Sequence, residues 1–291
     1  MSTSEPRTPF VAIACGGTGG HLFPGIAVAE ALKTRGCKTA LLISPKAIDQ
    51  HAAKGGRGAE TFTLPAVGLQ NRNYLSFGWS FWKSLKAVRR IFRNNRPEAV
   101  LAMGGFTSAP PVLAARKFGA KTFLHESNTI PGRANRFLMR FVDEAFVGFP
   151  ETAGHFKAGK KTTVTGTPVR AEFLRTSASA ESCRGLLGLE PDLPTILVVG
   201  GSQGASGLNA MILSALPSLA SRNWQWLHLT GENDFETARA AYASKKIKAR
   251  VRPFLAEMDL ALKSATIAIS RAGASSLAEM AAAQLPALLV P

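Results

Sequence analysis

The amino-acid sequence predicts an α/β protein made of two doubly wound, Rossmann-like domains, and three observations support that fold class. Short apolar and β-branched runs alternate with helical patterns along almost the whole chain, as in layers built around parallel sheets. A serine- and alanine-rich stretch at residues 176–182 interrupts this alternation, which restarts with a strand pattern at 195–199. The length of 291 residues is long for one hydrophobic core and fits two domains, which we place at 1–168 and 169–291.

The elements of the first half follow from apolar runs and from the glycines that end helices. Gly36 ends the first helix and Gly119 the second, because glycine is favoured just beyond the last helical residue. The strand patterns cover residues 12–15, 38–44, 61–64, 99–103, 121–124, 145–148 and 162–164, and the helical patterns cover 26–35, 110–118 and 131–141.

The second half repeats this organisation. A doubly wound domain normally places a helix after each strand, but the sequence stops on its last strand pattern, so we expect the second domain to be incomplete at its C-terminus. Its strand patterns cover residues 195–199, 226–230, 249–254, 265–270 and 286–291.

The composition limits the function without choosing it. The formal net charge of +16 favours anionic partners, which include nucleic acids, nucleotides and acidic lipids. The 3 cysteines are too widely spaced for a disulfide framework or a metal site. The first residues lack the apolar core of a signal peptide, and no run approaches the roughly 18 apolar residues of a membrane span, so we expect a cytoplasmic protein.

The most distinctive stretch is a glycine-rich loop at residues 16–20, which follows a strand and ends at His21. The pattern predicts a strand, a loop and a helix that begins after Pro24. Such a loop lets backbone N–H groups approach an anion, and a histidine exchanges protons near neutral pH. It is not a dinucleotide-binding fingerprint, because the third glycine would fall at Leu22 and the second strand ends on Ser-Pro instead of an acidic residue.

Further polar or glycine-rich loops follow other predicted strands. In open α/β sheets ligands bind at the carboxyl ends of the strands, so these loops are candidate ligand-binding segments. Two domains with such loops facing a common cleft suit a ligand with phosphate groups in its middle. The loops cover residues 104–108, 125–128, 200–204 and 271–276.

These motifs together resemble those of the MurG family of bacterial glycosyltransferases, in the family's order and over nearly the whole chain. The glycine-rich loop matches the family's Gly-Gly-Thr-Gly-Gly-His-x-x-Pro, and residues 200–205 match Gly-Gly-Ser-Gln-Gly-Ala. Phe106 and Thr167 depart from the family, which usually has tyrosine and asparagine at these positions. The other matching segments are 104–108, 125–128, 165–170, 254–258 and 271–279.

The resemblance implies a GT-B glycosyltransferase that moves N-acetylglucosamine from UDP-N-acetylglucosamine to a lipid-linked muramyl-pentapeptide acceptor. Ser202 would bind the diphosphate, Glu279 the ribose hydroxyls, and Phe254 would cover the uracil while the Leu255 backbone reads its edge. Arg170 would stabilise the departing UDP. The residues with an implied substrate-binding role are Thr18, Gly19, Gly20, Asn128, Arg170, Ser202, Gln203, Phe254, Leu255, Ala274, Ser275, Ser276, Leu277, Ala278 and Glu279.

Catalysis requires the acceptor hydroxyl to lose a proton as it attacks the anomeric carbon of the sugar. His21 is our first candidate for the general base, and His125 with Glu126 is the second. Direct displacement inverts the configuration of the sugar. The sequence contains no Asp-x-Asp motif to bind a metal-diphosphate complex, so we predict neither a required metal nor a cofactor.

The basic aromatic segment at residues 72–96 contains no acidic residue. As a helix it would pack an apolar stripe of Phe81, Leu85, Val88 and Phe92 on a sheet, beside a basic stripe. Aromatic side chains outside that stripe favour a surface of anionic lipids, hence a peripheral position on the inner face of the cell membrane. RNA is the alternative, but no RNA-recognition motif accompanies the segment, so we predict no nucleic-acid partner. The basic residues are Arg72, Lys83, Lys86, Arg89, Arg90, Arg93 and Arg96.

Two other functions remain open from the sequence. A different UDP-sugar GT-B transferase or a UDP-sugar epimerase would share the nucleotide site but not the lipid acceptor. The MurG family continues past the final strand into an Asp-x-Gln-x-x-Asn region that helps hold the donor sugar, and this region is missing here. An inactive, truncated nucleotide- or membrane-binding protein is therefore the other alternative.

Overall fold

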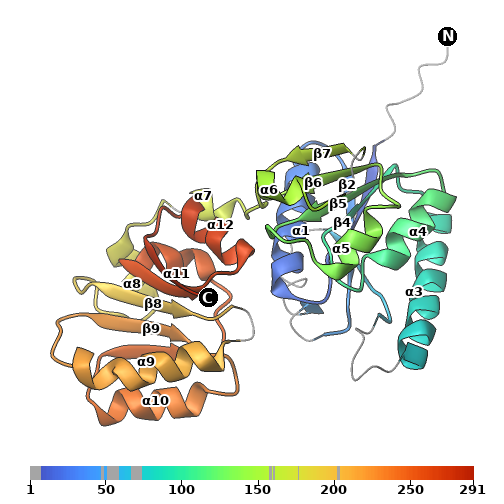
Figure 1. The fold of residues 1–291 in the computed structure, drawn as a ribbon. Helices are drawn as coiled ribbons and strands as arrows, with labels where there is room; N and C mark the ends of the chain where they lie inside the picture. The colour runs from blue at the N-terminus through green and yellow to red at the C-terminus, as the bar shows by residue number, and fades with distance from the viewer. Residues whose placement is uncertain are drawn as a thin grey trace. The chain divides into compact units, whose positions relative to one another are not determined.

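The computed structural model describes residues 8–46, 49–50, 59–66, 74–156, 159, 161–175, 177–201 and 204–291. These residues form two compact units, Met1–Arg170 and Ala171–Pro291, whereas the boundary predicted from the sequence lies at residue 168. Each unit is a parallel sheet with helices on both of its faces (Figure 1). The predicted fold class, two doubly wound α/β domains, is confirmed.

In the described residues, the first unit has a 7-stranded sheet with the order β3-β2-β1-β4-β5-β6-β7. All neighbouring strands are parallel, and Ala12 of β1 lies opposite Ala40 of β2 on one side and Val100 of β4 on the other. The order reverses between β1 and β4, which makes their carboxyl ends the switch point of this sheet. The strands are β1 (Phe10–Ala14), β2 (Lys38–Ile43), β3 (Glu60–Thr63), β4 (Ala99–Ala102), β5 (Lys121–Glu126), β6 (Glu144–Val147) and β7 (Lys161–Val164).

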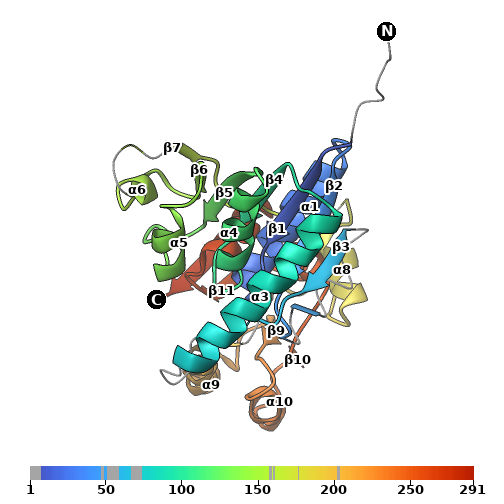
Figure 2. The ribbon, with the colours of Figure 1, turned by 90° about the vertical axis from the view of Figure 1, so that its right-hand side faces the viewer.

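Helices cover both faces of this sheet. Leu22 and Ile26 of α1 belong to one buried cluster with β1 and β2, and Val88 and Phe92 of α3 belong to another with the opposite side chains of the same strands. Figure 2 shows α3 and α4 together over one face. The burial of Val88 and Phe92 confirms the apolar stripe predicted for the basic aromatic segment. The helices are α1 (Gly19–Lys33), α3 (Tyr74–Asn94), α4 (Ala109–Lys117), α5 (Arg133–Leu138) and α6 (Pro150–Ala153).

The start of α1 differs from the prediction. We expected the helix to begin after Pro24, but it begins at Gly19 and contains that proline. Thr18 has an extended backbone, and its carbonyl accepts hydrogen bonds from the amides of His21 (3.1 Å) and Leu22 (3.0 Å), which forms the first turn. The prediction was wrong because a proline removes a single helical hydrogen bond, and the burial of apolar side chains on this helix offsets that loss.

In the described residues, the second unit has a 5-stranded parallel sheet with the order β10-β9-β8-β11-β12, and its switch point lies between β8 and β11. The largest fully buried side chains here are Trp226 of β9 and Tyr242 of α10. The strands are β8 (Thr195–Val199), β9 (Gln225–Leu229), β10 (Ala249–Arg252), β11 (Ile267–Arg271) and β12 (Ala287–Val290). The helices are α7 (Glu172–Arg175), α8 (Ala180–Leu186), α9 (Ser206–Leu219), α10 (Phe235–Ser244), α11 (Met258–Ser264) and α12 (Ala274–Ala282).

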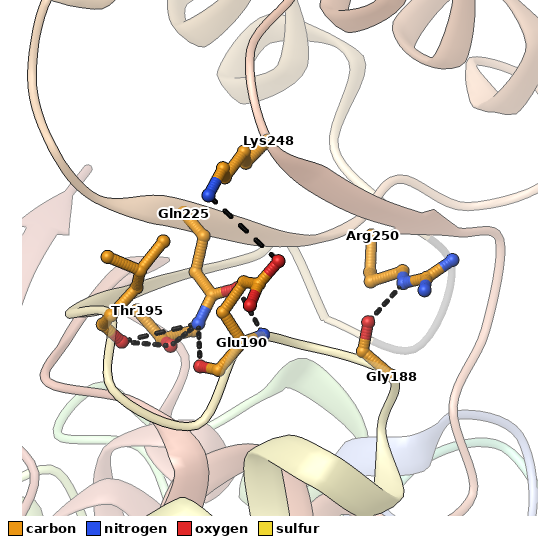
Figure 3. A network of polar contacts seen from close by, with 7 residues as sticks. Gly188, Glu190, Thr195, Gln225, Lys248 and Arg250 are labelled. Atoms are coloured by element: carbon orange, nitrogen blue, oxygen red, sulfur yellow. Dashed lines mark hydrogen bonds and ion pairs between the residues drawn. The ribbon is translucent and has the colours of Figure 1, made fainter.

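A polar network closes the amino end of this second sheet (Figure 3). The buried amide of Gln225 donates from Nε2 to the carbonyl of Glu190 (2.7 Å) and to Oγ1 of Thr195 (3.0 Å), and its Oε1 accepts from the Glu190 amide (2.8 Å). Lys248 lies 3.9 Å from the Glu190 carboxylate. These contacts fix the start of β9 at the end of the sheet opposite to the loops that follow the strands.

Candidate functional site

The first part of the candidate site is the switch point of the first sheet, where the loops after β1 and β4 meet. Oγ1 of Thr107 donates to the carbonyl of Gly16 (2.7 Å), and the imidazole of His21 lies against Gly104 and Gly105. A Cβ atom at Gly104 would lie 2.9 Å from Nε2 of His21, and one at Gly105 would lie 3.2 Å from Nδ1. Both glycines have positive φ angles, +107° and +76°. Glycine is therefore required here both by the backbone and by the space that the imidazole occupies.

His21 stands in the first turn of α1 in a state suited to accepting a proton. Burial lowers its pKa from the ordinary value of 6.5, and a smaller effect of His125 acts in the same direction. The carboxylates of Glu126 and Asp49 oppose that shift without cancelling it. Nδ1 of His21 lies 3.0 Å from Oγ1 of Thr18. Because its pKa is lowered, the imidazole is neutral at pH 7.

His125 and Glu126 lie at the end of β5, and both side chains are engaged in holding loops. His125 is buried, with Nε2 2.9 Å from the carbonyl of Gly166 and Nδ1 3.4 Å from Oγ of Ser127. Burial lowers the pKa of His125, while the contact with Gly166 and the charge of Glu126 oppose that shift. This arrangement ties the end of β5 to the loop that follows β7.

Glu126 organises the loop that follows its own strand. Its Oε1 accepts from the backbone and side-chain amides of Asn128 (both 2.9 Å), and its Oε2 accepts from the amide of Gly132 and from Nδ2 of Asn135 (both 2.9 Å). The exposed Asn128 is thus held at the rim of this loop. The structure assigns Glu126 four hydrogen bonds within the protein, and its predicted part in catalysis stays a prediction.

Asp49 is a residue of this site that the sequence analysis missed. Its buried Oδ2 accepts from the amide of Gly17 (2.7 Å), from the amide of Ser44 (3.1 Å) and from the Ser44 hydroxyl (2.5 Å). Lys46 donates to the carbonyl of Gly17 (2.8 Å). We expected the glycine-rich loop to offer its N–H groups to an anionic ligand, but the N–H of Gly17 is bound to a carboxylate of the protein itself. No local motif marks Asp49 in the sequence, because its contact with Gly17 joins residues 32 positions apart.

The remaining predicted residues of the first unit surround α1. Thr18 and Gly20 are exposed, and Gly19 is buried. The guanidinium of Arg170 lies 4.7 Å from the ring centroid of Phe23, which neighbours His21 by two positions on the same helix. The structure therefore places Arg170 in the first unit, packed on α1.

The second part of the candidate site is the carboxyl edge of the second sheet. Gly200 and Gly201 follow β8, Phe254 and Leu255 follow β10, and α12 follows β11 with Gly273 as its N-terminal cap. Because β8 and β11 are neighbours, the predicted diphosphate loop and the first turn of α12 start from adjacent strands. Ser202 and Gln203 lie outside the described residues.

The side chains on this edge differ in exposure. Phe254 is 42% exposed, whereas Leu255 is buried. The residues of α12 named in the sequence analysis are all half-buried: Ala274, Ser275, Ser276, Leu277, Ala278 and Glu279. Phe254 and Glu279 thus both follow strands of this sheet at its carboxyl edge, and their predicted part in binding a nucleoside stays a prediction.

Two parallel-sheet units with glycine loops at their switch points define the class of protein, a glycosyltransferase of the GT-B fold. Residues 11–147 match the Glycosyltransferase family 28 N-terminal domain, and residues 195–291 match the Glycosyltransferase family 28 C-terminal domain. The chain belongs to the MurG family within this class.

Two relatives and one solved structure support that assignment. The chain is 38% identical over 288 residues to a protein of Syntrophus aciditrophicus named UDP-N-acetylglucosamine–N-acetylmuramyl-(pentapeptide) pyrophosphoryl-undecaprenol N-acetylglucosamine transferase, with 97% of this chain and 77% of the relative covered. It is 40% identical over 285 residues to the protein of the same name from Parasynechococcus marenigrum, with 96% and 75% covered. The crystal structure of Acinetobacter baumannii MurG matches with a TM-score of 0.67 and 28% identity, covering 98% of this chain and 79% of that one.

Proposed function

We propose that this chain transfers N-acetylglucosamine from UDP-N-acetylglucosamine to the muramyl sugar of an undecaprenyl-diphosphate-linked muramyl-pentapeptide, with inversion at the transferred sugar. The observation that carries the proposal is the 38% identity, over 97% of this chain, to a relative whose name states this reaction. Each unit by itself offers groups that support the proposal: the first has a neutral histidine at its switch point, and the second carries Phe254 and Glu279 after strands of its sheet.

In this reaction His21 acts as the general base. Its lowered pKa keeps the imidazole neutral, which is the form that accepts the proton of an attacking hydroxyl. In the tautomer with the proton on Nδ1, Nδ1–H donates to Thr18 across 3.0 Å, and Nε2 keeps the lone pair that a base requires. His125, with Glu126 beside it, remains the second candidate, but its two ring nitrogens already have partners within the protein.

The second unit binds the donor in this proposal. Phe254 covers the uracil, the backbone of Leu255 reads its edge, and Glu279 accepts from the ribose hydroxyls, with residues 274–278 lining the pocket. Ser202 and Gln203 bind the diphosphate by analogy with the matching motif of the family. Arg170 contributes a positive charge toward the departing UDP. The exposure of Phe254 supports its role.

The first unit docks on an anionic membrane through α3, where the acceptor lipid resides. Trp79 and Trp82 are 59% and 50% exposed, and their rings stack with centroids 5.4 Å apart. The ammonium groups of Lys83 and Lys86 lie 5.1 Å and 5.4 Å from these two ring centroids. An exposed aromatic pair with cations over it matches the interface between headgroups and acyl chains, where aromatic rings and lysines are both favourable.

None of the helices in the described part of the chain combines the length and the hydropathy needed to cross a bilayer. The association that we propose is peripheral and lies on the inner face of the cell membrane.

The test is release of UDP from UDP-N-acetylglucosamine, measured with and without the lipid-linked muramyl-pentapeptide in vesicles. We expect release only when the acceptor is present, together with a product that carries one added N-acetylglucosamine. His21→Ala should release UDP about a thousandfold more slowly, which is the middle of the range of general-base effects. Conversion of the UDP-sugar without acceptor would instead indicate an epimerase. Binding of UDP without any turnover would contradict the proposal and indicate a nucleotide-binding protein.

A further inference from the structure

His228 is a buried titratable residue of β9 for which the mechanism above has no use. Its side chain is fully buried, with Nδ1 3.1 Å from the hydroxyl of Tyr242 and Nε2 3.0 Å from Oδ1 of Asn209. Burial lowers its pKa to about 4, although the negative charge of Asp234 opposes the shift. The imidazole is therefore neutral and has one N–H donor and one acceptor nitrogen.

The direction of every hydrogen bond in this network is determined by Asn209. Its Nδ2 donates both protons, one to the carbonyl of Thr230 (2.8 Å) and one to Oδ2 of Asp234 (2.7 Å). Oδ1 of Asn209 must then face His228 and accept, so His228 carries its proton on Nε2. Nδ1 of His228 is left as an acceptor, and the hydroxyl of Tyr242 donates to it. His228 thus fixes the orientation of the Asn209 amide.

Asn209 in turn holds the backbone at the carboxyl edge of the sheet. The Thr230 carbonyl that it binds is the group against which Gly204 packs, because a Cβ at Gly204 would overlap that oxygen. Gly204 has a φ angle of +76°, and its amide donates to the carbonyl of Gly201 (3.0 Å). The amide of Asn209 donates to the carbonyl of Ala205 (2.9 Å). The loop after β8 therefore rests on the pair formed by Thr230 and Asn209.

The same network reaches the first turn of α9. The Asp234 carboxylate accepts hydrogen bonds from the side chains of Asn209 and Ser206, and Ser206 is the first residue of that helix. The chain of contacts thus runs from the core of the unit, at Tyr242 and His228, to the loop between β8 and α9. An aliphatic residue at position 228 would fill the same space without this connection.

We propose that His228 is a positioning residue for the donor diphosphate: through Asn209 and the Thr230 carbonyl it holds Gly204, Ala205 and the start of α9 in the geometry that receives a nucleoside diphosphate. The proposal rests on the proposed function for the identity of the ligand, and on the network alone for the positioning. It assigns no contact between His228 and substrate. We expect the larger effect on the diphosphate, because the Thr230 carbonyl that Asn209 holds lies directly against Gly204. Phe254 is linked to this network only through the backbone hydrogen bonds that join Thr230 and Gly231 to Arg252 and Pro253.

Two substitutions of His228 test the two hydrogen bonds of the imidazole one at a time, the one that it donates and the one that it accepts. His228→Gln places an amide N–H near Nε2 and keeps the donor to Asn209. His228→Asn places its amide near the position of Nδ1. This variant keeps a hydrogen-bond acceptor for the Tyr242 hydroxyl but loses the hydrogen bond to Asn209. Gln225→Met provides the matched control, because it removes a buried polar network from the same strand at the opposite end of the sheet.

Two quantities are measured for each variant. Titration calorimetry gives the affinities for UDP and for uridine, and hydrogen exchange gives the exchange rates of the Gly204 and Asn209 amides in the protein without ligand. For His228→Asn we expect about tenfold weaker binding of UDP, little change for uridine, and about tenfold faster exchange at both amides, as for one lost hydrogen bond to a buried group. His228→Gln should stay within about threefold of the unsubstituted chain. Gln225→Met should lower the melting temperature while both exchange rates and the ratio of the two affinities stay unchanged.

The positioning role would be overturned if His228→Asn weakened the binding of UDP and of uridine equally, or if hydrogen exchange at both amides were unchanged in this variant. It would also be overturned if exchange at these amides rose as much in Gln225→Met as in His228→Asn. Absence of UDP binding by the unsubstituted chain would contradict the proposed function instead, and the exchange comparison, which uses no ligand, would still decide whether His228 holds the loop.

Discussion

The imidazole of His21 lies so close to Gly104 that a Cβ atom there would stand 2.9 Å from Nε2. The two residues come from different motifs, one in the first turn of α1 and one in the loop after β4. Their contact means that the shape of the second loop sets the position of the proposed general base.

Gly104→Ala should displace His21 and lower kcat/KM by about a hundredfold, because a misplacement of a catalytic group by a fraction of an ångström to 1 Å has effects of that size. The matched control is Gly119→Ala. Gly119 also has a positive φ angle, +73°, but nothing lies within 4 Å of a Cβ built there. Both variants should lose about 1 kcal/mol of stability from backbone strain. Equal activity in the two variants would show that the position of His21 does not depend on Gly104.

Thr18→Val should lower kcat about tenfold or more, because Nδ1 of His21 loses the oxygen that selects its tautomer. Thr18→Ser keeps the hydroxyl and should retain nearly all activity. Since burial lowers the pKa of His21, the acidic limb of the rate profile of the unsubstituted chain should lie below pH 6.5. Steady-state rates from pH 5 to 8 test both points, and an acidic limb above 6.5 would exclude His21 in the role proposed here.

The double variant Trp79→Ser, Trp82→Ser should bind vesicles of phosphatidylglycerol at least tenfold more weakly, because two half-exposed rings no longer enter the interface. Neutralisation by Lys83→Gln and Lys86→Gln should remove roughly 1 kcal/mol of binding free energy per lost cation, and the effect should shrink as salt is added. Trp224→Phe, in the second unit, is the control. Sedimentation with vesicles measures the partition, and unchanged binding of the double variant would rule out α3 as the docking face.

The stability of the second unit should fall as the pH drops from 6.5 to about 4, the interval between the ordinary and the lowered pKa of His228. The unfolded chain binds the proton first in this interval, so acid favours unfolding. At pH 5 the loss relative to pH 7 should be roughly 2 kcal/mol from this residue. Urea unfolding is followed by the emission of Trp224 and Trp226, both in the second unit, in a background without Trp79 and Trp82, and compares the chain that has His228 with His228→Gln. The lowered pKa values of His21 and His125 contribute equally to the pH dependence of both proteins. If the two plots of unfolding free energy against pH run parallel, His228 is not the source of the acid destabilisation.

Much of the fold could be predicted from the sequence because parallel strands that are buried on both faces read as short apolar runs. The strand pattern at 195–199 coincides with β8, and most other strands shift by one to three residues at an end. Helices were harder to predict. α8, at Ala180–Leu186, lies partly in the serine- and alanine-rich stretch that we interpreted as an interruption, although Ser179 caps it by accepting from the amide of Ser182 (3.2 Å).

The candidate site was predictable only where a motif carries it. His21, Gly104 and His125 belong to short signatures, and the structure brings these residues together at one sheet edge. Asp49 and the pair of His228 with Asn209 have no local signature, because the contacts join residues 32 and 19 positions apart in the sequence. From the sequence alone, a single polar residue in or after a strand is equally compatible with a buried and with an exposed position.

The carboxylate of Asp49 on the N–H of Gly17 also has a consequence for stoichiometry. Both units have a parallel sheet with a glycine loop at its switch point, the kind of loop that accepts the phosphates of a nucleotide. In the first loop the Asp49 carboxylate lies 2.7 Å from the amide nitrogen of Gly17. Its negative charge would repel a second anionic group placed beside it. Since the N–H of Gly17 already has this partner, we expect a nucleotide titration to saturate at one equivalent per chain.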